Sequence, residues 1–530
     1  MHMKKRRVLK GLAALTLGAR MSRSVSAAAQ SPHPSDLTAT LAALASGGTT
    51  SLALVRQSLA RIHQFDQRGP KINAVIELNP DAIDAARALD HERKSGKLRS
   101  PLHGVPILIK DNVATGDRMK TTAGSLALAE HPAHADAHIV KRLREAGLVI
   151  IGKTNLSEWA NFRSSRSLSG WSGRGGLTRN PYALDRNTSG SSSGSGAAVA
   201  AGYVPFAVGT ETDGSIVSPA QINGLVGLKP TLGLVSRHGI IPIAESQDTA
   251  GPMSCTVHDA ALLLQVLAGK DPADPITTKA PAAPDYVTAL RKDGLRGARL
   301  GVVRGYFGSN PDVNALIDDA IKVLVAQGAV IVDPVALPDP ATYGDAETTV
   351  LLHEFKTGMA SYLAEFAPNS GLHGLADLIA WNRREAGREM PFFGQDLMEK
   401  ADATQGLHAK VYLDARAHCI EVTRTKGIEK ALADGHLDAL IAPTGGPAWM
   451  TDFVNGDNSG FSFSGPAAVA GLPHLTVPAG LVHGLPVGLS FVGAAWSEAT
   501  LLRLGYAYEQ ASHARQLPTY VAHIPLPGSA

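Results

Sequence analysis

The stretch that decides the fold runs from residue 190 to residue 208 and reads Gly-Ser-Ser-Ser-Gly-Ser-Gly-Ala-Ala-Val-Ala-Ala-Gly-Tyr-Val-Pro-Phe-Ala-Val. Its first seven residues have the composition of a flexible linker, but a linker separates independent cores. Here the Gly/Ser segment passes directly into a small-residue helix, 197–201, and then into an apolar strand, 204–208. Glycine permits close backbone contacts and unusual dihedral angles. The Gly/Ser-rich stretch that ends at Gly196 begins at Trp171, and we therefore predict that residues 171–196 form an active-site loop between packed elements.

Helical and strand patterns alternate on both sides of this stretch. Apolar residues recur at helical spacing over 35–64, and a second helix is expected over 81–94, capped by Asp81. A helix over 137–146 precedes a strand at 148–151. Further strands are expected at 105–110, 439–442, 475–478 and 487–492, a last helix at 498–509, and mostly helix over 305–430. This alternation predicts an α/β fold with one large, mixed, twisted sheet covered by helices on both faces.

The composition agrees with one large globular domain. The chain has 530 residues, of which 44% are hydrophobic and 18% charged, as suits an extensive buried core. Its 54 glycines and 32 prolines favour a loop-rich enzyme over a helical bundle. No internal repeat and no clean linker is visible. We expect a single domain over residues 30–530.

The formal net charge of +3 is concentrated at the start of the chain. Seven basic residues and no acidic residue precede position 30, namely Lys4, Lys5, Arg6, Arg7, Lys10, Arg20 and Arg23. Subtracting these seven charges from +3 leaves −4 for the remainder. A nucleic-acid-binding domain keeps its basic stripe within the folded part. We therefore expect no nucleic-acid partner.

Residues 1–29 have the pattern of an export signal. A basic start is followed by an apolar run, 11–18, and by small residues at 26–29 that suit cleavage. The pair Arg6-Arg7 is typical of twin-arginine export. The apolar run is too short to cross a bilayer of about 30 Å. The sequence thus predicts an exported, periplasmic or secreted protein with no stable membrane span.

No zinc-binding motif is present, because His353-Glu354 lacks the second histidine. No well-placed GxGxxG loop of a dinucleotide-binding site occurs either. We expect neither a metal nor a cofactor. Cys255 and Cys419 are interpreted as two buried thiols, although the sequence leaves their pairing open. The oligomeric state is open as well.

Three segments carry residues suited to catalysis. The first, residues 104–112, contains a short apolar run over 105–110 that ends in the charged Lys110. Burial would lower the pKa of this lysine and make its neutral amine a base, although a lysine at a strand end is ordinarily solvated. The second segment is the loop 190–196. The third, 209–216, reads Gly-Thr-Glu-Thr-Asp-Gly-Ser-Ile and places Ser215 after a turn where backbone N–H groups can converge on an oxyanion.

Together these segments resemble the amidase signature family. That family combines a lysine after an apolar strand, a Gly/Ser-rich loop and a downstream nucleophile turn, with its signature core here at about 100–270. The resemblance extends over nearly the whole chain, because further family segments recur in order at 152–159, 224–231, 248–253, 470–473 and 484–489.

The resemblance implies specific roles. Ser215 is the acylated nucleophile and Lys110 is the base. Ser191, which is joined to Gly190 by a cis peptide bond, relays the proton between them. The backbone N–H groups of Thr212, Asp213 and Gly214, with that of Ser215, are the candidate oxyanion hole. Many members have glycine where this chain has Ser193. This variant, with Thr-Glu-Thr-Asp-Gly-Ser at 210–215, is similar to the peptide amidase branch, which releases ammonia from C-terminally amidated peptides. The implied partner is a small-molecule or short peptide amide.

Supporting residues have plainer interpretations. Asp248 is expected to brace the nucleophile loop, and Lys153 and Lys229 to be surface or structural cations rather than second bases. Three aromatic residues suit either a substrate groove or the core, namely Trp159, Phe162 and Trp171.

Alternatives remain at the level of the sequence. Residues 190–194 also fit the G-x-S-x-G elbow of α/β-hydrolases, which would make Ser192 the nucleophile of an esterase. That fold needs a strand before the elbow, but 179–189 is polar, and the later histidines have no evident acid partner (His436, His474 and His483). Within the family, the alternatives are a general aliphatic or aryl amidase and a component of a tRNA-dependent amidotransferase. A binding protein on an inactive amidase scaffold is another.

Overall fold

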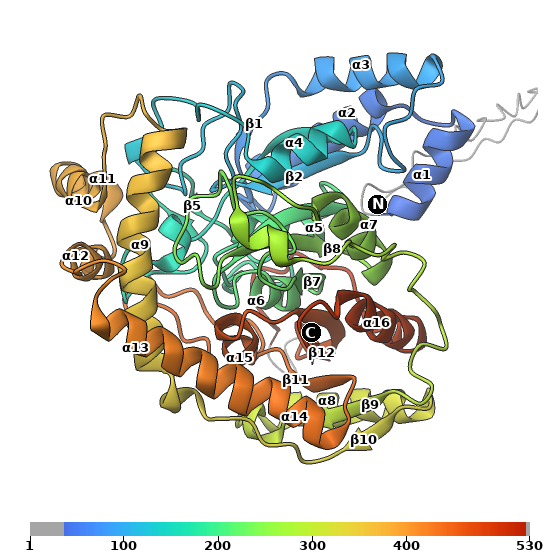
Figure 1. The fold of residues 1–530 in the computed structure, drawn as a ribbon. Helices are drawn as coiled ribbons and strands as arrows, with labels where there is room; N and C mark the ends of the chain where they lie inside the picture. The colour runs from blue at the N-terminus through green and yellow to red at the C-terminus, as the bar shows by residue number, and fades with distance from the viewer. Residues whose placement is uncertain (1–35, 526–530) are drawn as a thin grey trace, which may run out of the picture.

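A computed structural model describes residues 36–525 (Figure 1). These residues form one large α/β domain around an 11-stranded sheet with the order β1-β3-β2-β6-β8-β7-β12-β13-β11-β9-β10. The sheet is mixed, since β3, β2 and β6 run parallel whereas β6, β8 and β7 alternate in direction. The predicted fold class is therefore confirmed. The predicted export signal, 1–29, lies outside the described residues.

The strands are short and mostly buried. Their bounds are β1 (Val75–Leu78), β2 (Pro106–Lys110), β3 (Val149–Thr154), β6 (Phe206–Glu211), β7 (Val226–Lys229), β8 (Thr249–Ser254), β9 (Arg299–Val302), β10 (Val330–Val332), β11 (Ala439–Pro443), β12 (His474–Val482) and β13 (Leu485–Val492). A separate hairpin pairs β4 (Trp171–Ser172) with β5 (Gly176–Leu177).

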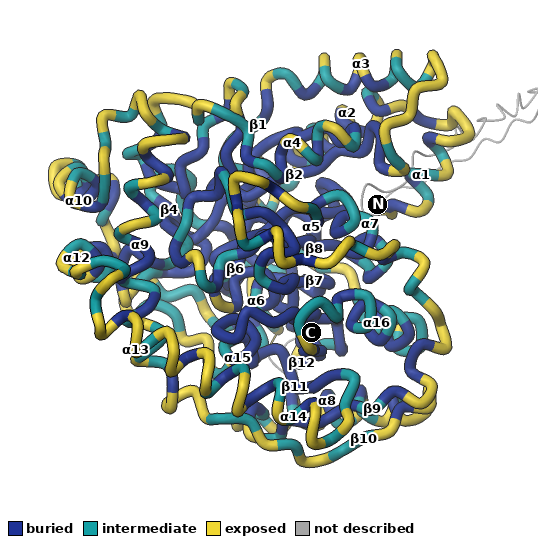
Figure 2. Tube along the Cα trace, viewed as in Figure 1, coloured by how far each residue is buried: buried dark blue, intermediate teal, exposed yellow. Residues whose placement is uncertain are grey.

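Helices surround the sheet, and exposed residues concentrate on their outer sides (Figure 2). The helices are α1 (Leu37–Ser46), α2 (Ser51–Arg61), α3 (Ala82–Lys94), α4 (His138–Glu145), α5 (Ser193–Ala200), α6 (Val217–Ile222), α7 (Val257–Leu267), α8 (Pro311–Ala326), α9 (Gly344–Phe366), α10 (Leu375–Arg384), α11 (Ala386–Glu389), α12 (Asp396–Asp402), α13 (Lys410–Cys419), α14 (Glu429–Gly435), α15 (Ser464–Val469) and α16 (Glu498–Ser512). No helix in residues 36–525 is long and apolar enough to cross a membrane.

Strand β2 shows why both faces of the sheet are covered. Ile107 and Ile109 join one hydrophobic cluster, whereas Leu108, between them, joins another that contains the α5 alanines. Successive strand residues point to opposite faces. Lys110 therefore points to the same face as Leu108, where α5 packs. The strand pattern thus directs the lysine toward the Gly/Ser loop that begins this helix.

The expected elements differ from the observed ones mainly at their ends. The pattern over 35–64 is two helices, because Gly47 ends α1 in a left-handed conformation with a φ of 74°. The small-residue helix begins earlier, at Ser193, and the following strand continues to Glu211. The prediction that the Asp81 side chain caps α3 is wrong. Asp81 occupies the N-cap position, but its carboxylate binds the Arg118 guanidinium instead of a helix N–H.

The two cysteines lie apart in the core. Cys255 is buried in the cluster with the α5 alanines, and Cys419 is buried in a different cluster with Tyr343. Both are thiols in the structure, as interpreted from the sequence.

We expect Gly194→Ala to destabilise the protein, because α5 begins too close to other backbone for a side chain. A Cβ at Gly194 would lie 2.3 Å from the Ala74 carbonyl oxygen and 2.5 Å from that of Asn155. Overpacking of this kind costs about 1–3 kcal/mol, so the midpoint of thermal unfolding of a domain this large should fall by about 1–3 °C. Gly344→Ala is the matched control, since no atom lies within 4 Å of its Cβ position. Equal midpoints for the two variants would contradict the prediction.

Candidate active site

The sheet brings the three predicted segments together at one edge. Strands β2 and β6 are parallel neighbours, with Ile109 opposite Val208. The carboxyl ends of parallel strands meet at the same edge of a sheet, so Lys110 and Thr210 lie side by side. The two candidate serines precede short helices at this edge, Ser191 before α5 and Ser215 before α6.

Lys110 contacts Ser191 directly. The Lys110 Nζ lies 2.7 Å from the Ser191 Oγ, and both residues are fully buried. The peptide bond between Gly190 and Ser191 is cis, as the family resemblance implies. The lysine amine also lies 2.9 Å from the Thr210 Oγ1 and 3.2 Å from the Thr210 carbonyl oxygen. Three oxygens thus surround the amine.

The surroundings of Lys110 favour its neutral form. Burial lowers the pKa of this lysine to about 7, although the charges of Asp248 and Glu211 oppose the shift. Burial removes the water that stabilises an ammonium group. An amine with a pKa near 7 is partly neutral at physiological pH and can accept a proton.

Ser215 is buried but slightly more accessible than Ser191. It retains 8% exposure whereas Ser191 and Lys110 retain none. The backbone N–H of Ser192 donates to the Ser215 carbonyl oxygen at 3.3 Å, which holds the two loops together. Within residues 36–525 no hydrogen bond joins the Ser191 and Ser215 hydroxyls, so the second link of the predicted triad is not formed. Catalytic hydrogen bonds of this kind often tighten only when substrate binds.

Hydrogen bonds to two carboxylates hold the turn that carries Ser215. The Glu211 carboxylate accepts hydrogen bonds from the N–H groups of Ile216 at 2.7 Å and Val217 at 3.0 Å. The Thr212 hydroxyl donates to Asp248 at 2.6 Å, and Gly214 has a φ of 77°. The sequence predicts that Asp248 braces this turn by hydrogen bonds to the backbone of the turn, but the carboxylate binds the turn through the Thr212 side chain. The backbone N–H groups that donate to Asp248 are those of Ile243 at 2.8 Å and Ala244 at 2.9 Å.

The candidate oxyanion hole includes three backbone N–H groups that precede Ser215. The backbone N–H groups of Thr212, Asp213 and Gly214 have no hydrogen-bond acceptor among the described residues. Unpaired donors beside a nucleophile are suited to stabilising a developing oxyanion.

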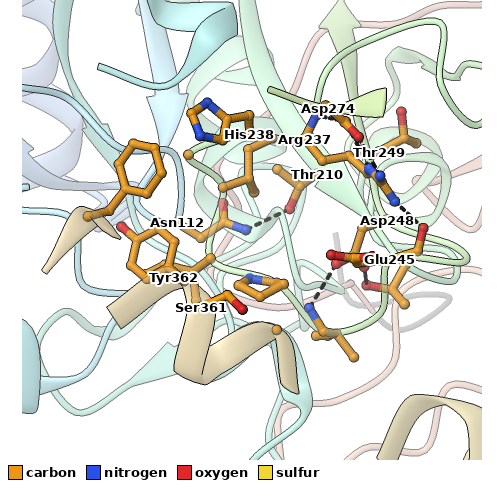
Figure 3. A pocket seen from close by; sticks show the side chains of 18 of the residues that line it. Asn112, Thr210, Arg237, His238, Glu245, Asp248, Thr249, Asp274, Ser361 and Tyr362 are labelled. Carbon is orange, nitrogen blue, oxygen red and sulfur yellow. Dashed lines mark hydrogen bonds and ion pairs between the residues drawn. The ribbon is translucent and has the colours of Figure 1, made fainter. Parts of the chain in front are cut away.

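Two cavities flank the 210–215 segment. One, of about 220 Å³, is lined by Asn112, Thr210, Arg237, Asp248 and Tyr362, among others (Figure 3). Asn112 donates to the Thr210 Oγ1 at 3.0 Å. The other, of about 260 Å³, lies on the nucleophile side, and we call it the nucleophile cavity. Its lining includes Gly190, Asp213, Gly214, Trp449 and Phe461.

The remaining predicted residues are structural. Lys153 is buried and donates to the Val113 carbonyl oxygen at 2.5 Å, and Lys229 is buried and donates to that of Pro230 at 3.2 Å. Neither is a surface cation. The three aromatic residues proposed for either groove or core are buried in the core, namely Trp159, Phe162 and Trp171.

Ser192 does not have the geometry of an α/β-hydrolase elbow. Its side chain is fully buried, donates to the Thr210 carbonyl oxygen at 3.0 Å and accepts from the Thr210 N–H at 3.2 Å. Of the histidines considered as its base, His474 is buried against the Ser490 hydroxyl at 2.6 Å. The expectation that none has an acid partner is wrong for His483, which lies 3.0 Å from the Asp312 carboxylate, but both of these side chains are exposed to solvent whereas Ser192 is buried. Ser192 fixes Thr210 rather than facing a cavity. Among the described residues no group of three His, Cys, Asp or Glu side chains could hold a metal ion.

The family model described as Amidase matches residues 53–502 of this sequence. The chain belongs to the amidase family. A probable amidase of Arabidopsis thaliana is 40% identical over 484 residues, which cover 89% of each chain. A putative amidase of Schizosaccharomyces pombe is 36% identical over 499 residues, covering 87% of this amidase and 83% of that one. A glutamyl-tRNA(Gln) amidotransferase component of Chloroflexus aurantiacus is 39% identical over 496 residues, with coverage of 90% and 96%.

Solved structures extend the comparison. Native peptide amidase from Stenotrophomonas maltophilia is 49% identical and superposes with a TM-score of 0.87, covering 93% of this chain and 99% of that one. An amidase family protein from Bacillus anthracis is 38% identical, with a TM-score of 0.82 and coverage of 90% and 91%. The chain is therefore an enzyme that acts on amide C–N bonds, with the single-domain α/β fold of its relatives.

Proposed function

We propose that this amidase hydrolyses carboxamides through an acyl-enzyme on Ser215, and that C-terminally amidated peptides are its substrates. The observation that carries the chemistry is the 2.7 Å contact between the Lys110 amine and the Ser191 hydroxyl, buried at the edge of the sheet. A neutral amine has two N–H groups and one lone pair. When these N–H groups donate to the two Thr210 oxygens, the lone pair faces the Ser191 O–H.

The proton then moves along the three side chains. Lys110 takes the proton of Ser191 while Ser191 takes that of Ser215, whose oxygen attacks the amide carbonyl carbon. The N–H groups of residues 212–215 stabilise the oxyanion. The chain reverses to protonate the leaving nitrogen, ammonia departs, and water, activated along the same path, hydrolyses the ester on Ser215.

The choice of peptide amides rests on similarity and on the nucleophile cavity. The structural relative with a TM-score of 0.87 is a peptide amidase, and a solved complex of that enzyme holds the competitive inhibitor chymostatin. The nucleophile cavity, of about 260 Å³, is open enough to accept more than a small aliphatic amide. A general aliphatic or aryl amidase is the second candidate, because the Arabidopsis relative is named only as a probable amidase.

The substrate proposal is tested by hydrolysis of four compounds: an amidated dipeptide, the matching anilide, a short aliphatic amide and glutamine. Ammonia release measures the three primary amides, and aniline release measures the anilide. We expect the amidated dipeptide to give a kcat/KM at least about tenfold above the others, since each well-placed group of a substrate contributes a factor of this size or more. The anilide retains the acyl part and changes only the leaving group, so it is the matched control. Preference for the aliphatic amide would instead support the general amidase.

We also propose that residues 1–29 direct export. The support is the sequence pattern, with seven basic residues, an apolar run and small residues at 26–29. Expression of the full chain in a bacterial host, followed by cell fractionation, should place the protein outside the cytoplasm. The variant Arg6→Lys with Arg7→Lys should retain it inside if the twin-arginine route is used. Equal cytoplasmic retention of both forms would contradict export.

A further inference from the structure

Two loops far apart in the sequence expose aromatic rings beside each other. Phe392 is 45% exposed and Phe453 is 40% exposed, and their ring centroids are 4.5 Å apart. Val454, next along the chain, is 76% exposed. We call Phe392, Phe453 and Val454 the aromatic shelf. A cluster of large apolar side chains left in contact with water commonly marks a binding surface.

The first loop is held by a buried arginine. The Arg163 guanidinium donates to the carbonyl oxygens of Glu389, Phe393 and Gly394, the last two at 3.2 Å each. It also pairs with the Glu158 carboxylate, with both side chains fully buried, and lies 4.1 Å from the centre of the Phe393 ring. Burying an ion pair is costly unless its hydrogen bonds are satisfied. This one is satisfied by the loop backbone, so the position of Phe392 is fixed rather than incidental.

The second loop is tied to the residues that follow Arg163. Asp457 accepts hydrogen bonds from the Ser169 N–H at 2.9 Å and from the Trp449 Nε1 at 3.1 Å. The Arg166 guanidinium donates to the Val454 carbonyl oxygen at 3.0 Å. The same short segment, 163–169, therefore positions both loops and hence both rings.

One loop connects the shelf to the lining of the nucleophile cavity. The loop that carries Phe453 also supplies Trp449, Asp457, Ser459 and Phe461 to the cavity lining. The opposite lining includes Gly190 and Gly214, the residues that precede Ser191 and Ser215. A peptide that runs from this cavity along the loop reaches the shelf.

We propose that the aromatic shelf is a subsite for an apolar or aromatic side chain of the peptide, upstream of the amidated residue. This inference rests on the proposed function, because it takes the peptide amide as the substrate. The two rings offer an apolar surface to a side chain that is otherwise hydrated, and its burial favours binding of the peptide. The shelf contributes to peptide binding at a distance from the reacting atoms, so it acts on KM more than on kcat.

The test uses acetylated tripeptide amides with phenylalanine placed at each position in turn, and triglycine amide as the reference. We expect one upstream phenylalanine to raise kcat/KM about tenfold over triglycine amide, through KM. Phe392→Ser and Phe453→Ser should each remove most of that preference and leave turnover of triglycine amide within about twofold. Val411→Ser and Leu413→Ser are the matched controls, because these α13 side chains are 58% and 52% exposed and belong to neither loop. They should keep the preference.

The outcomes separate the subsite from the chemistry. A preference that persists in the double variant Phe392→Ser/Phe453→Ser overturns the subsite, and so does the absence of any phenylalanine preference in the unaltered protein. Equal losses on triglycine amide and on the phenylalanine peptides would show a general structural effect and overturn it as well. Failure of the unaltered protein to cleave any peptide amide would instead reject the proposed function.

Discussion

Replacing Ser215 by alanine should lower kcat by about 10⁴-fold or more on every amide, as loss of a covalent nucleophile does in other hydrolases. The substitution removes the attacking oxygen and keeps the backbone N–H groups of the turn. The Glu211 carboxylate still binds the N–H groups of Ile216 and Val217, so the turn should keep its shape. Ammonia release measures the rate, and calorimetric titration with a peptide amide should show that binding is preserved.

Ser192→Ala is the informative companion of this variant. Ser192 contacts the Thr210 backbone and is fully buried, so its removal should slow the reaction by disturbing Thr210 without abolishing it. Mass spectrometry of enzyme quenched during turnover should find the acyl group on Ser215 in the unaltered protein and in Ser192→Ala. An acyl group on Ser192, or a Ser215→Ala protein that retains most of its activity, would refute the assigned nucleophile.

The sequence predicted the site well where local pattern and three-dimensional position coincide. Lys110 ends an apolar strand whose alternation directs it to the α5 face, and the Gly/Ser loop begins α5. The contact between Lys110 and Ser191 follows from these local features together with the family resemblance. Thr210 lies within the quoted nucleophile segment, but its two contacts with the lysine amine depend on strand register, which the sequence does not specify.

The parts that escaped prediction come from distant segments. Trp449 and Phe461 line the nucleophile cavity from the last fifth of the chain, and no local motif marks them. Arg163 reaches the 389–394 loop across more than two hundred residues. Such contacts depend on how loops fold over the sheet edge. The alternation of apolar residues determines the sheet, but it carries little information about the loops.

Lys110→Met should be nearly inactive, with kcat lowered by about 10³-fold or more, because the remaining groups offer no base to the Ser191 hydroxyl. Methionine keeps much of the length and volume of the side chain and removes the amine. The circular dichroism spectrum and unfolding midpoint of the variant should stay close to those of the unaltered protein. A Lys110→Met protein with substantial turnover would show that the base lies elsewhere.

The pH profile of the unaltered enzyme should report the same amine. With a Lys110 pKa of about 7, the neutral base predominates above pH 7 and is lost below it. We therefore expect kcat/KM to be level at alkaline pH and to fall about tenfold per pH unit well below 7. A rate that stays constant from mildly acidic to alkaline pH would contradict a neutral lysine base.

The variant Asp248→Asn tests whether Lys110, and not another group that titrates near pH 7, causes the acidic limb of the kcat/KM profile. The Asp248 carboxylate raises the lysine pKa through its charge, against the larger lowering caused by burial. Removing that charge should move the acidic limb of the kcat/KM profile to lower pH, because the ammonium loses a favourable interaction. Asparagine keeps an oxygen that can accept the Thr212 hydroxyl, but its NH2 group replaces the oxygen that accepts from the N–H groups of Ile243 and Ala244. The unfolding midpoint of the variant is therefore measured together with the pH profile. A limb that moves to higher pH, or does not move, would mean that the titrating group is not the amine beside Ser191.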